Sequence, residues 1–190
     1  MLRFVLLLLC ASAALTCVPG SAQDGRDLTE EARKQYSQTL KEAAGLVKDK
    51  QYANAQAKLD VLLAQRPREP QARFLKGVVQ TEQGHGDAAI ATFSGLIEDY
   101  PELPEPYNNL AVLYAQKGEY ESARVALETA VKAAPDWSVA RENLGDVYAR
   151  LAAAEYDRAA KLDRSNKTAA AKLALAREML APAAAVKPKT

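Results

Sequence analysis

A single repeating interval along the sequence is the feature that most constrains how this chain folds. The spacing from Pro67 to Pro101 equals that from Pro101 to Pro135, and three other sets of residues recur at the same interval. Those sets are Ala43, Gly77, Ala111 and Gly145; Ala55, Ala89 and Ala123; and Leu59, Phe93 and Leu127. Because a fixed period of roughly 20–50 residues is typical of repeat architectures, the chain is predicted to be an array of similar stacked units.

Each unit is predicted to be two helices joined by a turn, and residues 104–137 show this most clearly. Apolar residues recur at helical spacing on both sides of Lys117-Gly118-Glu119, where Gly118 can adopt the left-handed conformation that ends a helix. Ala111 and Ala123 are small where the two helices should cross, so their backbones can approach closely. Pro135 lacks an N–H and disfavours helix at the preceding residue, so it ends the second helix.

Residues 104–137 closely resemble the tetratricopeptide repeat. Nine positions match its pattern, namely Tyr107, Leu110, Ala111, Tyr114, Tyr120, Ala123, Leu127, Ala130 and Pro135. Residues 70–103 and 36–69 are weaker copies. The resemblance implies an all-α fold, a right-handed superhelix or α-solenoid of stacked antiparallel helix pairs. It also implies that Tyr114 and Tyr148 pack in the core or between helices.

The two ends of the array depart from the repeat. Before the first unit, Asp27-Leu-Thr-Glu30 is typical of a capping box, which would start the first helix near Leu28 and extend it as a cap. The fourth unit lacks the turn with its glycine, and no Gly or Pro occurs between Asp146 and Ala181. Residues 138–163 are therefore predicted to form one long helix, followed by a capping helix at about Lys167 to Leu180.

The first residues are typical of a secretory signal peptide. Arg3 precedes an apolar run from Phe4 to Val18, which Pro19-Gly20 interrupts. That run is shorter than the roughly 20 residues needed to span a bilayer, so cleavage before Gln23 and export to the periplasm are expected, with no membrane span afterwards. Lipid attachment at Cys17 is the less favoured alternative, because the residues before it fit a lipoprotein signal poorly.

The predicted organisation follows from these boundaries. It comprises a signal peptide (1–22), an N-terminal capping extension (23–35), three repeats (36–69, 70–103 and 104–137), a degenerate repeat with a long helix and a capping helix (138–181), and a disordered tail (182–190).

Charge and side-chain chemistry exclude several classes of function. With Arg3 removed, the 25 basic residues fall to 24 and equal the 24 acidic ones, so the basic excess of a nucleic-acid binder is missing. Cys10 and Cys17 both lie in the predicted signal. His85 is the single histidine and lies between two glycines at an expected turn. We therefore expect no catalytic residues, no metal site and no cofactor.

A binding groove is what the resemblance leaves as the functional site. In proteins of this family, side chains of the first helix of each pair usually line an inner, concave groove. The corresponding residues here are Leu40, Phe74, Val78, Thr81, Glu105, Asn108, Val112, Gln116, Glu142 and Asp146. The set runs from apolar to acidic, which predicts an extended ligand with an apolar stretch and a basic end.

These observations favour a periplasmic scaffold that binds a peptide or a partner protein through the groove. The alternative is an accessory module of a cell-envelope enzyme or assembly complex, bound through the outer face or the ends. The sequence leaves the identity of the partner and the oligomeric state open.

Overall fold

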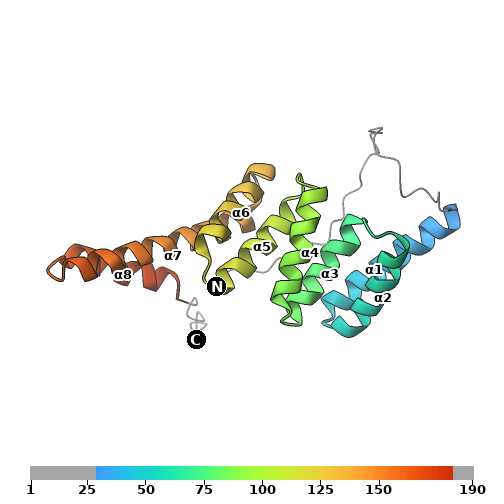
Figure 1. The fold of residues 1–190 in the computed structure, drawn as a ribbon, viewed down its shortest axis with the longest axis horizontal. Helices are drawn as coiled ribbons and strands as arrows, with labels where there is room; N and C mark the ends of the chain where they lie inside the picture. The colour runs from blue at the N-terminus through green and yellow to red at the C-terminus, as the bar shows by residue number, and fades with distance from the viewer. Residues whose placement is uncertain (1–28, 182–190) are drawn as a thin grey trace, which may run out of the picture. The chain divides into compact units, whose positions relative to one another are not determined.

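The structure is a computed structural model that describes residues 29–181; the predicted signal peptide and tail lie outside the described residues. Within that range it has eight α-helices and no β-strand, which confirms the all-α fold (Figure 1). The helices are α1 (Glu30–Lys48), α2 (Tyr52–Gln65), α3 (Pro70–Glu82), α4 (Gly86–Asp99), α5 (Pro104–Gln116), α6 (Tyr120–Ala133), α7 (Ser138–Leu162) and α8 (Lys167–Met179).

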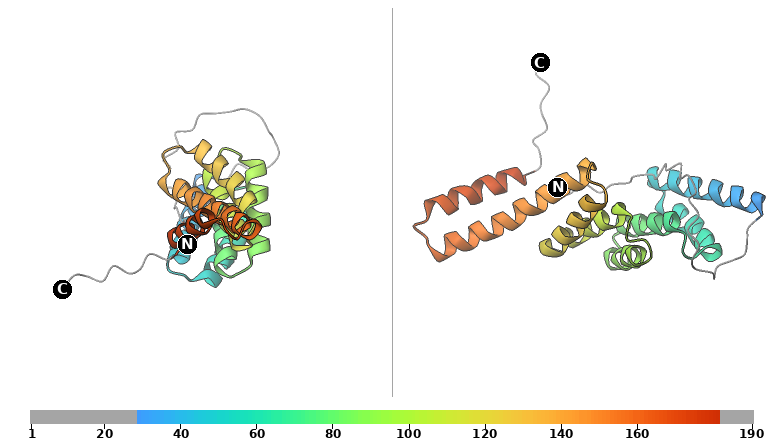
Figure 2. Two further views of the ribbon diagram at one scale, coloured as in Figure 1. Left: turned by 90° about the vertical axis from the view of Figure 1, so that its left-hand side faces the viewer. Right: turned by 90° about the horizontal axis from the view of Figure 1, so that it is seen from above.

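The described residues divide into two compact units, one ending at Pro101 and the other beginning at Glu102. In the first unit, α1 packs on α2 and α3 packs on α4, with α3 also contacting α1 and α2. In the second unit, α5 pairs with α6, and α7 contacts both of these helices and α8 (Figure 2). Each unit is thus built from antiparallel helices packed side by side.

The turns inside the first three repeats share one backbone conformation. Lys50, Gly84 and Gly118, which stand at equivalent positions of these repeats, have φ values of 59°, 79° and 78°. In the third repeat, the N–H of Glu119 donates to the carbonyl of Tyr114 at 2.9 Å, and the N–H of Gly118 donates to the carbonyl of Ala115. The same pair of bonds forms in the other two turns. These bonds satisfy the last carbonyls of the first helix and reverse the chain.

The repeat prolines end the second helix of each pair, as predicted. Arg66, Tyr100 and Ala134 each precede a proline and have φ values of −136°, −138° and −134° in place of helical ones. Steric conflict with the proline ring disfavours helical backbone at that position. The helices therefore stop at equivalent positions in the first three repeats.

Small residues stand where the helices of a pair cross. A Cβ atom added to Gly77 in α3 would lie 2.6 Å from the ring of Phe93 in α4, and Phe93 is fully buried. In the third repeat, Ala111 and Ala123 are fully buried against Leu127. The close approach of the paired helices thus depends on the absence of larger side chains in these columns.

The fourth repeat forms one helix where the others form two. α7 runs without interruption over 25 residues and α8 follows it, which confirms the predicted long helix and capping helix. Val147 is buried in an apolar cluster with residues of α5 and α6, and Leu144 and Leu151 pack against that cluster. The side chain of Asn166 caps α8 by accepting a hydrogen bond from the N–H of Ala169.

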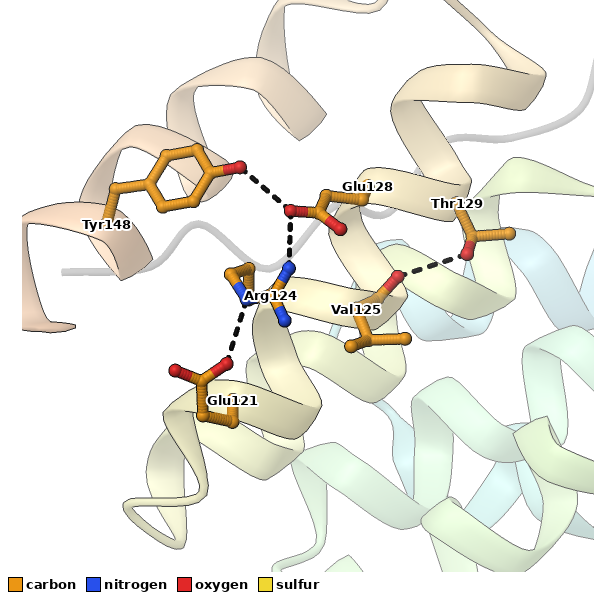
Figure 3. A network of polar contacts seen from close by, with 6 residues as sticks. All are labelled: Glu121, Arg124, Val125, Glu128, Thr129 and Tyr148. Atoms are coloured by element: carbon orange, nitrogen blue, oxygen red, sulfur yellow. Dashed lines mark hydrogen bonds and ion pairs between the residues drawn. The ribbon is translucent and has the colours of Figure 1, made fainter.

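A polar network on the surface holds α7 to α6 (Figure 3). The Tyr148 hydroxyl donates to Oε1 of Glu128 at 2.8 Å, and Arg124 donates to Glu128 and to Glu121. The hydrogen bonds from Arg124 and Tyr148 lower the pKa of Glu128 below its ordinary value. Tyr148 is 47% exposed, so it links two helices at the surface and is no core residue.

The start of the first helix differs from the prediction. α1 begins at Glu30, and the side chain of Thr29 accepts the hydrogen bond from the N–H of Ala32. Helix therefore begins two residues later than expected, with Thr29 in the capping role that the sequence pattern gave to Asp27. Thr29 suits this role because a threonine hydroxyl oxygen readily accepts from the first turn of a helix.

Candidate protein-binding site

A buried pair of asparagines joins the first helices of the third and fourth repeats. Nδ2 of Asn143 in α7 donates to Oδ1 of Asn108 in α5 at 2.8 Å. Both side chains are inaccessible to solvent. A hydrogen bond between two carboxamides in such a setting is a specific contact, because each group would otherwise lose its bonds to water. The pair therefore fixes how α5 and α7 lie against each other.

Further polar atoms on α5 are buried and have no hydrogen-bond partner. They are Oε2 of Glu105, Nδ2 of Asn108, and both Nδ2 and Oδ1 of Asn109. The three residues stand at i, i+3 and i+4, so they share one face of the helix. A buried polar atom that lacks a hydrogen bond costs about 1–3 kcal/mol. This face of α5 thus holds a concentration of polar groups that the described part of the chain leaves unsatisfied.

The other groove residues predicted in the second unit are arranged less uniformly. Val112 on α5 is buried, at 2% exposure, while Gln116 near the end of the same helix is exposed. On α7, Glu142 is exposed and Asp146 is half-buried. The structure therefore brings the predicted residues of α5 and α7 onto adjacent helices, and the accessible ones are polar or acidic.

The groove residues predicted in the first unit lie mostly inside it. Phe74 and Val78 are 4% and 1% exposed, and the Phe74 ring lies 5.8 Å from that of Phe93 in a tilted arrangement. Leu40 and Thr81 are half-buried, and the Thr81 hydroxyl donates to the carbonyl of Gly77 in its own helix. Phe74 thus packs against its own helix pair, and the apolar end of the predicted groove stays a prediction.

Asn109 is the residue of this face that the sequence reasoning missed. It is not among the family positions that usually line the groove, yet its carboxamide is buried and unsatisfied at both atoms. The signal available in the sequence was its position four residues after Glu105 and next to Asn108. Two consecutive asparagines inside a helix are otherwise unfavourable, since asparagine is a poor helix former.

The described residues, 29–181, were also compared with what a metal site, a histidine-based site and a membrane-spanning helix require. That range contains no group of three or more His, Cys, Asp or Glu side chains placed to hold a metal ion. His85 is exposed and immediately precedes α4. No helix in the described range has the length and apolar character needed to cross a membrane.

Comparison with known sequences identifies the family. The sequence profile of the tetratricopeptide repeat matches residues 46–108 and 81–151, which together span more than half of the chain. The chain belongs to the tetratricopeptide-repeat family. No protein in the curated sequence comparison matches it.

Comparison with solved structures gives the same fold. The Yersinia enterocolitica type III secretion chaperone SycD, in complex with a peptide of the translocator YopD, is similar with a TM-score of 0.58 and 17% identity, over 64% of this chain and 98% of that one. YrrB, a TPR protein with an unusual peptide-binding site, has a TM-score of 0.52 and 26% identity, over 56% and 55% of the chains. MamA from Desulfovibrio magneticus has a TM-score of 0.54 and 19% identity, over 78% of each chain.

Proposed function

We propose that this chain is a non-catalytic scaffold that binds a peptide or a partner protein through the face shared by α5 and α7. The proposal rests on the accessible polar groove residues that lie on these two contacting helices, Gln116 on α5 and Asp146 on α7. An extended peptide presents one N–H and one carbonyl per residue, and both need hydrogen bonds when they leave water. A carboxamide side chain can donate to one and accept from the other.

Two further observations support peptide or protein binding. The similar structure of SycD holds a peptide of the translocator YopD, and YrrB, which is 26% identical to this chain, has an unusual peptide-binding site. Two groove residues predicted on these helices, Glu105 and Asp146, are acidic and half-buried. They favour a partner segment that carries a basic residue, whose charge would mainly increase the association rate.

We also propose that the scaffold works in the periplasm after removal of residues 1–22. The proposal rests on the signal-peptide pattern of the first residues. Intact mass and N-terminal sequencing of the exported protein would test it. A soluble protein starting near Gln23 is expected, whereas a protein that begins at Cys17 and carries acyl chains would replace a free periplasmic scaffold with a membrane-anchored one.

Site-specific photo-crosslinking in cells would test the binding face. A crosslinker in place of Gln116, which is exposed on α5, should capture a partner, while one in place of Val125, which is 54% exposed on α6, serves as the matched control. Asp146→Lys should weaken the Gln116 crosslink in a protein that keeps its helical content, because it reverses a charge on the proposed binding face. Capture at Val125 alone, insensitive to Asp146→Lys, would contradict the proposal and favour an accessory module bound through its outer face.

A further inference from the structure

The capping helix α8 exposes a face that nothing in the described residues covers. α8 contacts α7 and no other described helix, and it buries Ala169, Leu173 and Ala176 in that contact. The opposite side carries a second set of apolar or small side chains, all exposed: Ala170, Ala171, Ala174, Leu175 and Met179. Leu175 and Met179 are 61% and 74% exposed. This face therefore combines small and apolar side chains with the exposed charges of Lys167 and Glu178 at its two ends.

The charges at the two ends of this face run against the dipole of α8. Lys167 is the first residue of the helix, where the dipole favours a negative charge, and Glu178 lies in the last turn, where it favours a positive one. Both side chains are exposed. The helix dipole therefore does not account for either charge, although Arg177 in the same last turn matches it. An opposite charge from outside the chain would offset each of the two.

Two copies of this face, placed antiparallel to each other, are complementary in charge. Lys167 and Glu178 are eleven residues apart, or about three turns, so they lie on the same side of α8. Ala171 and Ala174 stand between them, symmetric about the same midpoint. In an antiparallel pair of α8 helices, Lys167 of one copy would thus lie opposite Glu178 of the other, and the alanines would meet at the centre.

We propose that a second copy of this chain covers this face, with the two α8 helices packed antiparallel about a twofold axis. The alanines let the helix backbones approach, and Leu175 of each copy fills the space beside Ala171 of the other. Lys167 pairs with Glu178 twice, once at each end. Two helices of 13 residues bury less than about 1,200 Å², so the dimer is weak and dissociates on dilution.

Sedimentation velocity of the purified protein over a wide range of concentrations tests the dimer. The wild type should shift from monomer to dimer as concentration rises. Leu175→Glu should weaken dimerisation about a hundredfold or more, because it places a charge in the apolar contact beside Ala171 of the other copy. Leu162→Glu is the matched control, because Leu162 is 89% exposed at the end of α7 and lies off this face, so it should have no effect. A wild type that stays monomeric throughout would overturn the proposal.

Exchanging the charges of Lys167 and Glu178 tests the antiparallel pairing. This test holds even if Leu175→Glu fails to fold. Lys167→Glu or Glu178→Lys alone should weaken dimerisation about tenfold, because two ion pairs become like-charge contacts. Both single changes improve the match with the helix dipole, so they should not unfold α8. The double variant should restore dimerisation to within about twofold of wild type. Dimerisation that is unaffected by the single changes, or not restored in the double variant, would overturn the proposal.

Discussion

The second repeat and the fourth begin with the same kind of helix, but only the second closes into a pair. In the second repeat, α4 folds back on α3 and the ring of Phe93 covers Gly77. In the fourth, α7 continues as one helix, and Gly145, in the same column as Gly77, has open space where a Cβ would lie. A small residue in this column is thus needed for packing only where the second helix of the same repeat folds back and contacts it.

The tyrosines at equivalent positions of the third and fourth repeats differ in the same way. Tyr114 packs partly buried against the apolar cluster of its own helix pair, whereas Tyr148, at the equivalent position of the next repeat, is 47% exposed. Because α7 does not fold back, no second helix of the same repeat covers Tyr148. The side chain instead reaches Glu128 on the preceding helix, α6.

Gly77→Ala is expected to have the largest effect on stability. The added methyl group would overlap the buried ring of Phe93, and overpacking of this kind costs about 1–3 kcal/mol even though alanine is the better helix former. Urea unfolding followed by circular dichroism would measure the change. A variant as stable as wild type would show that α3 and α4 separate easily, and the contrast with the fourth repeat would be lost.

Gly118→Ala should destabilise by about 1–2 kcal/mol, since the backbone of Gly118 is left-handed and an alanine there is strained. The equivalent position of the fourth repeat is Ala152, inside α7, where no turn forms. Lys50→Gly is the matched change in the opposite direction and should stabilise by about 1 kcal/mol or less, because Lys50 already has φ 59°. If both substitutions lowered stability, the left-handed turn would not be what separates closed repeats from the fused one.

Gly145→Ala should stabilise the protein by up to about 1 kcal/mol. It lies inside α7, and nothing within 4 Å of the added Cβ opposes the gain in helix propensity. The same unfolding experiment that measures Gly77→Ala would measure it. Destabilisation would mean that another segment covers Gly145, and that the fourth repeat is closed after all.

Tyr148→Phe should have the smallest effect, a slight loss of stability at neutral pH. The change removes the hydrogen bond to Glu128, an exposed contact that solvent screens. Because the folded-state pKa of Glu128 is depressed, the stabilisation from its charged form is present above the unfolded pKa and is lost as pH falls through the folded one. The difference from wild type should therefore shrink in acid. A large loss at neutral pH would make Tyr148 a core residue.

Much of the fold was predictable because the relevant signals are local. The absence of Gly and Pro between Asp146 and Ala181 predicted the uninterrupted helix, and the repeat prolines predicted where second helices end. The binding face was less predictable. Whether an asparagine is paired depends on which residue of another helix reaches it, so the bond between Asn108 and Asn143 and the unsatisfied amide of Asn109 could not be read from spacing.

The buried hydrogen bond between Asn143 and Asn108 holds α7 against α5, whereas the buried carboxamide of Asn109 has no hydrogen-bond partner in the described residues, and two substitutions test this difference. Asn109→Leu removes a buried carboxamide that has no hydrogen-bond partner, whereas Asn143→Leu removes the donor to Asn108. We expect Asn109→Leu to leave the free energy of unfolding unchanged or to raise it, and Asn143→Leu to lower it by about 1–3 kcal/mol. Equal destabilisation by the two substitutions would contradict the view that the hydrogen bond between Asn143 and Asn108 is what holds α7 against α5.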